Sequence, residues 1–131
     1  IEFRFAMASD LPRVVCQPQP LRQAVLHSLQ FAIAAVEAGA KNGRSVRLEA
    51  TSEGSQVQIL VAHSGARFED PVRAFDSYAD LRTVLGEAGD AASLGLSLCA
   101  SILKENNGRA SAVNLDPHGA AILLELQAQK G

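Results

Sequence analysis

The order in which strand-like and helix-like spacings follow one another is the strongest constraint on the fold of this chain. Apolar and polar residues alternate in residues 1–7, 45–51 and 56–62, which is the period of half-buried strands. Between the first two runs the spacing changes to that of a helix, from Leu21 to about Ala38, with Pro20 near its first turn. The first half of the chain therefore predicts a strand, a long helix and two further strands.

The second half repeats this pattern after an irregular stretch. Residues 68–92 show the weakest periodicity and are predicted to form a lid-like loop of low local stability. Ser93 is a candidate cap for a second helix that ends near residue 106. Two more alternating runs, 109–115 and 120–126, close the chain. This order predicts an α/β fold, a two-layer sandwich of one mixed, mostly antiparallel sheet with helices packed on one face.

Composition restricts the function classes. A chain of 131 residues fits one domain, here 1–131, and 47% hydrophobic with 20% charged residues is the balance of a globular protein. A net charge of −2 and a pI of 5.9 argue against nucleic acid as a partner. The apolar runs are too short to span a bilayer, so we expect no membrane contact by this domain.

Because residue 1 is Ile1, we expect an excised domain or a processed product. Cys16 and Cys99 form no paired motif, so we expect free thiols and a cytoplasmic protein.

Four short strings, in this order and spacing, give the chain a family resemblance. They are residues 21–26 (LRQAVL), residues 57–61 (VQILV) running into Ser64-Gly65, residues 94–99 (LGLSLC) and residues 107–110 (NGRA). Together they resemble the ATP-binding catalytic domain of sensor histidine kinases, whose superfamily includes gyrase-type and Hsp90-type ATPase domains. The resemblance extends over residues 1–126 and implies the same two-layer sandwich.

The resemblance also implies where a nucleotide would be held, and the first helix departs from the family pattern there. Phe31 stands where the family has an Asn that binds Mg²⁺, and a phenyl ring offers no oxygen to a hard cation. His27 matches an Asn one turn earlier, and Ala34 matches a phosphate-pairing Lys. Gln23 and Gln30 carry the nearby side-chain amide oxygens, and both are poor substitutes for the family's Asn.

The positions that the resemblance assigns to the adenine are also changed. His63 stands where an Asp accepts a hydrogen bond from the adenine amino group, and a neutral imidazole can accept only one bond. Gly65 keeps the first glycine of that box, but Arg67 replaces the second. Ala121 stands where the family often has a Thr.

The phosphate-binding box is reduced to one glycine. Ala91 and Ser93 occupy two of its glycine positions, and only Gly95, between Leu94 and Leu96, remains. The amides of a helix that starts here would still attract an anion. The scaffold strings match while the nucleotide contacts do not, so we expect Mg-ATP binding to be impaired or lost and no cofactor to be required.

Several of these residues have a simpler interpretation. Phe31 is either a surface aromatic or a ring that fills the former nucleotide pocket, and burial of large aromatics favours the second. His27, His63 and His118 are candidate metal ligands, but lone histidines without ligand spacing are more often structural.

These observations lead to one hypothesis and two alternatives. The first is a degenerate histidine-kinase-type domain, a pseudokinase of bacterial two-component signalling that acts through protein partners. Such partners would be the dimerisation hairpin of a kinase, a response-regulator receiver domain or another signalling protein. The phospho-accepting hairpin itself is not in this chain. The alternatives are an active kinase domain that uses ATP and Mg²⁺, and an anti-sigma-like partner-binding module on the same fold.

Overall fold

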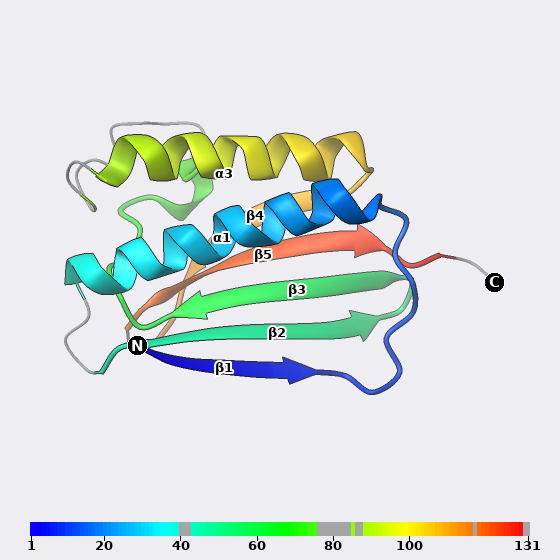
Figure 1. Ribbon diagram of the computed structural model, residues 1–131, viewed down its shortest axis with the longest axis horizontal. Coiled ribbons are helices and arrows are strands. Elements are labelled where there is room, and N and C mark those ends of the chain that lie inside the picture. Colours follow the sequence, from blue (N-terminus) through cyan, green and yellow to red (C-terminus); the bar gives the residue numbers. More distant parts are fainter. Residues whose placement is uncertain (40–42, 76–84, 86–87, 117, 130–131) are drawn as a thin grey trace.

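A five-stranded sheet forms one of two layers (Figure 1). The computed structural model describes residues 1–39, 43–75, 85, 88–116 and 118–129. The strands are β1 (Glu2–Met7), β2 (Ser45–Glu53), β3 (Gln56–His63), β4 (Arg109–Asn114) and β5 (Ala120–Gln127). Their order is β1-β2-β3-β5-β4, in which only β1 and β2 run parallel. The predicted mixed, mostly antiparallel sheet is confirmed.

Two long helices form the second layer. Figure 1 shows α1 (Pro18–Gly39) and α3 (Ala88–Glu105) side by side on one face of the sheet, where α1 contacts β2 and β3, and α3 contacts β4 and β5. A short 3-10 helix, η1 (Pro71–Arg73), lies against β4. The predicted order of elements and the one-sided helical layer are both confirmed. None of the described helices is long and apolar enough to cross a membrane.

The buried face of α1 differs from the predicted one. The helical spacing predicts a buried stripe of Leu21, Val25, Leu29, Ala32, Ile33 and Val36. Ala32 and Val36 are fully buried, whereas the four larger residues Leu21, Val25, Leu29 and Ile33 are only half-buried. The fully buried face is made mostly of small residues: Ala24, Ser28, Phe31, Ala32, Ala35 and Val36. Small side chains let α1 lie close to both the sheet and α3, because the backbone can approach where no large side chain intervenes. Cys99 of α3 is buried against Ser28 at this crossing, whereas Cys16 is half-buried, and both thiols are free.

The second helix begins earlier than predicted. Ser93 does not cap it, because α3 starts at Ala88 and Ser93 lies inside the helix. Its first turns contain several alanines, which favour helix. The predicted loop over 68–92 therefore ends before Ala88, where α3 begins. The first part of that stretch contains the buried Phe68 and η1. Most of the remaining lid-like stretch, residues 76–84 and 86–87, lies outside the described residues.

The first strand is not half-buried. All six residues of β1 are exposed, although the apolar ones share the face that carries the helices, since Phe3 and Phe5 are aligned with the buried Val46 and Leu48 of β2. The reason is that α1 covers β2 and β3 and does not extend over β1.

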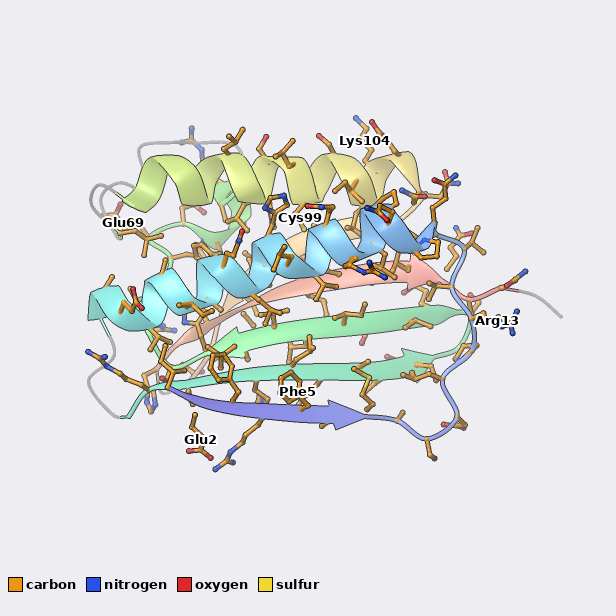
Figure 2. All side chains as sticks on the ribbon, in the orientation of Figure 1. Glu2, Phe5, Arg13, Glu69, Cys99 and Lys104 are labelled. Atoms are coloured by element: carbon orange, nitrogen blue, oxygen red, sulfur yellow. The ribbon has the colours of Figure 1, made fainter. Side chains whose placement is uncertain are left out.

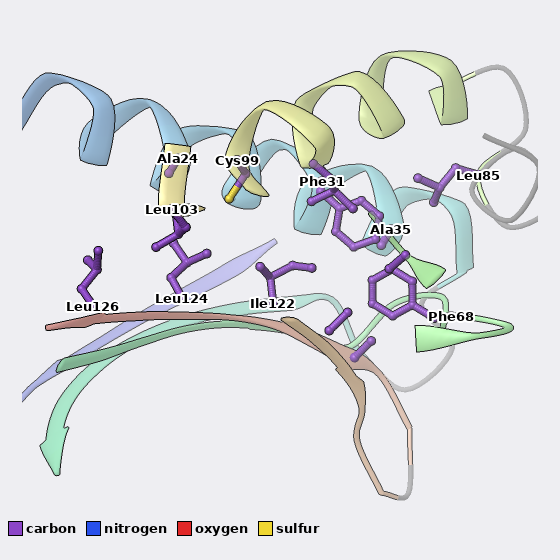
Figure 3. Packing of buried hydrophobic residues seen from close by; sticks show 14 residues of the cluster. Ala24, Phe31, Ala35, Phe68, Leu85, Cys99, Leu103, Ile122, Leu124 and Leu126 are labelled. Carbon is purple, nitrogen blue, oxygen red and sulfur yellow. The ribbon is translucent and has the colours of Figure 1, made fainter. Parts of the chain in front are cut away.

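We predict that Leu103→Ala will lower the free energy of unfolding by about 2–5 kcal/mol, because it removes a fully buried side chain that packs against β5 (Figure 3). Leu94→Ala, on the exposed side of the same helix, should change it by less than about 0.5 kcal/mol. Urea unfolding of both variants measures the difference. Equal effects would contradict this account of the core.

Candidate functional site

His63 ends β3 on the face of the sheet that carries the helices. It pairs with Val46 of β2 on one side and with Ala120 of β5 on the other, and both neighbours are fully or almost fully buried. Side chains at directly paired positions point to the same face. His63 therefore lies between the sheet and α1, and only 4% of it is exposed.

A glycine brings the turn after His63 against the end of α1. A Cβ at Gly65 would lie 2.2 Å from the carbonyl oxygen of Ala35, so no larger residue fits without a backbone shift. The N–H of Ala66 donates to that same oxygen at 3.1 Å, and the Ser64 hydroxyl accepts from Ser45 N–H at 2.9 Å. These contacts set the distance between the end of β3 and α1, and with it the space around His63.

That space is filled by two stacked phenyl rings. The ring of Phe31 from α1 lies parallel to that of Phe68, with centroids 5.2 Å apart, and meets the imidazole of His63 edge-on at 5.8 Å. Phe31 is 2% and Phe68 5% exposed. Figure 3 shows both phenylalanines in the gap between α1 and the sheet. We call Phe31, His63 and Phe68 the aromatic cluster. Phe31 is therefore not a surface aromatic.

A side-chain amide on β4 holds Phe68 in this position. The Oδ1 of Asn114 accepts the N–H of Phe68 at 2.8 Å, and its Nδ2 donates to the carbonyl of Phe68 at 2.9 Å. Asn114 thus satisfies both backbone groups of Phe68, much as a neighbouring strand would. These two hydrogen bonds attach the segment after β3 to β4.

The hydrogen bond that His63 accepts indicates which of its ring nitrogens carries the proton. Its Nδ1 accepts from Gly65 N–H at 3.0 Å, so in the neutral imidazole the proton is assigned to Nε2. Nε2 is buried and has no hydrogen-bond partner among the described residues. Burial disfavours the charged form and lowers the pKa of His63 to about 4. At neutral pH the side chain is an uncharged group with one unpaired donor.

The positions expected to contact phosphate lie at the crossing of the two helices. A Cβ at Gly95 would lie 3.3 Å from Nδ1 of His27, so this glycine lets α3 approach α1. Gly95 is inside α3 and not at its start, because seven helical residues precede it. Its amide is therefore in the interior of a helix, where backbone N–H groups are bonded to the preceding turn. Leu96 is buried in the core, Leu94 is exposed, and Ala34 is half-buried.

Other predicted positions point elsewhere. Arg67 is exposed, with Nη2 3.8 Å from the carboxylate of the exposed Asp116, a weak contact in water. Ala121 pairs with Ala62 and so faces away from the helices, whereas Ala120 is the residue opposite His63. His118 is exposed beyond the end of β4.

These residues do not fit Mg²⁺ with a bound nucleotide. Mg²⁺ requires oxygen ligands, and the position that the resemblance assigns to its ligand holds the buried ring of Phe31. The position of the adenine-accepting Asp holds His63, whose free ring nitrogen is a donor. Within the described part of the chain, no group of three or more His, Cys, Asp or Glu side chains is placed to hold a metal ion.

Sequence reasoning missed three residues of this site. The sequence places Phe68 only at the beginning of the loop and Asn114 only within a strand, and the resemblance points to Ala121 instead of Ala120. One signal was available for Phe68, since a large aromatic shortly after the Ser64-Gly65 turn is well placed to fold back over it. Nothing in the sequence links Asn114 to Phe68, because 46 positions separate them.

The fold is that of the catalytic, ATP-binding domains of sensor histidine kinases. By sequence, the chain matches no family model and none of the curated proteins. By structure, it is similar to the catalytic domain of histidine kinase ThkA in a nucleotide-free form, with a TM-score of 0.72 and 18% identity over 99% of this chain and 81% of that one.

Two further solved structures are similar. Full-length ShkA in complex with AMPPNP gives a TM-score of 0.70 at 24% identity and covers 99% of this chain and 26% of that one. ThkA in complex with the response regulator protein TrrA gives 0.69 at 20% identity and covers 97% of this chain and 34% of that one.

We predict that Asn114→Ala will lower the free energy of unfolding by about 1–3 kcal/mol, because it leaves two backbone groups of Phe68 unpaired. Amide hydrogen exchange should also accelerate at Phe68. Val113→Ala, on the exposed side of the same strand, is the matched control. Unchanged protection of the Phe68 amide in Asn114→Ala would show that the pair does not hold the segment.

We predict that the free energy of unfolding decreases as the pH is lowered from about 6.5 to about 4, because of the lowered pKa of His63. The unfolded state takes up a proton near pH 6.5, whereas the folded state does so only near pH 4, so acid favours unfolding by up to about 3 kcal/mol over this interval. His63→Gln should flatten this part of the stability profile. His118→Gln, at an exposed histidine, should leave it unchanged, and the same slope in all three proteins would contradict the assignment.

Proposed function

We propose that this domain is a degenerate histidine-kinase-type module of bacterial two-component signalling, in the cytoplasm, which does not bind Mg-ATP and acts through protein contacts. The observation that carries the proposal is the aromatic cluster. Phe31 and Phe68 stack within the space between α1 and the end of β3, and Phe31 also contacts His63. The resemblance assigns the position of Phe31 to the metal ligand and that of His63 to the adenine contact.

Both the shape and the polarity of this space support the loss of nucleotide binding. A nucleotide would have to displace two packed rings, and removal of one buried Phe from a core costs about 3–5 kcal/mol. After displacement, the adenine amino group would meet the Nε2–H of His63, a donor facing a donor. Mg²⁺ would find no carboxamide oxygen at residue 31, and the phosphates would find no free amides at Gly95.

A role through protein contacts is supported by the fold and by one neighbour. ThkA has been seen in complex with a response regulator protein. For this chain we propose a partner of the same kind, a receiver domain, or the helical hairpin of a kinase. The scaffold is retained although its nucleotide contacts are not, which fits a domain whose surface is the functional part.

We predict that saturating ATP with Mg²⁺ produces neither calorimetric heat nor a shift of the melting temperature of the 131-residue chain. A ligand present at 100 times its dissociation constant would stabilise the folded state by about 2.7 kcal/mol, an increase of several degrees in melting temperature. ShkA, which has been seen with AMPPNP, is the positive control.

Mg²⁺-dependent binding in that experiment would overturn the proposal and favour the alternative of an active kinase domain. An absence of binding leaves two protein-interaction functions, the two-component module and an anti-sigma-like module. Titration with a purified receiver domain, followed by the amide spectrum of this chain, separates them.

A further inference from the structure

The outer edge of the sheet, at β1, has the features of a surface that pairs with another strand. Such pairing is separate from the proposed function. In its parallel pairing with β2, the backbone groups of the even residues point inward, as shown by Glu2 N–H donating to Arg44 and Ala8 N–H donating to Ala50. The backbone groups of Phe3, Phe5 and Met7 therefore point outward. No described strand pairs with this side of β1.

The edge also carries exposed apolar side chains, and few features of β1 would prevent another strand from pairing with it. Phe5 is 67% and Met7 63% exposed, and Phe3 is exposed beside them, all three aligned with buried residues of β2 on the face that carries the helices. Figure 2 shows Phe5 at this edge. Natural edge strands avoid pairing through proline, charged side chains or a bulge. Strand β1 has no proline, and its two charges, Glu2 and Arg4, are of opposite sign and pair with each other. Such an edge accepts another strand, which satisfies the backbone groups and covers the aromatic side chains.

The charges of β1 select a second copy of the same strand as the occupant. If Phe3 is paired antiparallel with Phe3 of a second copy, Glu2 of each chain lies opposite Arg4 of the other. Opposite charges at paired positions stabilise a sheet, and like charges destabilise it. A shift that places Phe3 opposite Phe5 would put Arg4 against Arg4. The strand is thus complementary to itself in the first of these registers.

We propose that two copies of this chain associate through antiparallel pairing of their β1 edges, about a two-fold axis at Phe3, to form one continuous sheet. Arg4 and Glu2, which already form an exposed ion pair at 2.8 Å within one chain, would join their counterparts on the face away from the helices. The phenylalanines of both strands would meet on the helical face, between the two α1 helices. Because the shared surface involves one six-residue strand, the association is expected to be weak.

The test is the mass of the 131-residue chain in sedimentation equilibrium from about 1 µM to 1 mM. We expect the mass to rise with concentration from 13.8 kDa toward twice that value. Arg4→Glu and Glu2→Arg, both at exposed positions, should each remain at the monomer mass because each places like charges across the axis. An equimolar mixture of the two variants should recover the dimer, since every pair across the axis is then complementary.

The mixture distinguishes pairing between chains from the ion pair within one chain, which both variants lack. Arg109→Glu is the matched control, because it makes the same charge change on β4, at the opposite edge of the sheet, and should leave the dimer intact. A wild-type chain that stays monomeric, a mixture that fails to recover the dimer, or an equal effect of Arg109→Glu would each overturn the proposal. None of these outcomes depends on whether the domain binds ATP.

Discussion

The close approach of Gly65 to the carbonyl of Ala35 is the contact on which the arrangement of the two layers depends. It joins the end of β3 to the last turns of α1 at a distance that a single methyl group would prevent. Small residues on the buried face of α1 continue this close packing along the helix. On the α3 side, Gly95 lies beside the side chain of His27, where a Cβ would make a tight contact of 3.3 Å. The helical layer is therefore positioned by residues that lack bulk.

Close packing of this kind leaves little free volume, and the aromatic cluster fills what remains. Phe31 comes from the helix, His63 from the sheet, and Phe68 from the segment after β3 that Asn114 fastens in place. The same three elements would have to separate to admit a ligand. Packed rings and paired backbone groups resist such a separation.

The elements of the fold were readable from the sequence, but their exposure was not. Alternation and helical spacing located all five strands and both long helices to within a few residues. The same alternation predicted that β1 is half-buried, and this was wrong, because burial depends on what lies above a strand. The start of α3 was also misplaced: Ser93 is a good cap by residue type, yet the alanines before it continue the helix.

For the site, the sequence by itself determined which chemical groups are present: a phenyl ring at residue 31, an imidazole at 63, and Ala91 and Ser93 at two positions where the resemblance expects glycine. Only the tertiary structure decided how these groups are used. It brings Phe68 and Asn114 together across 46 positions, turns Ala120 and not Ala121 toward His63, and leaves the apolar edge of β1 open. The physical reason is that local spacing controls the conformation of each segment, whereas contacts between distant segments follow from packing the whole layer.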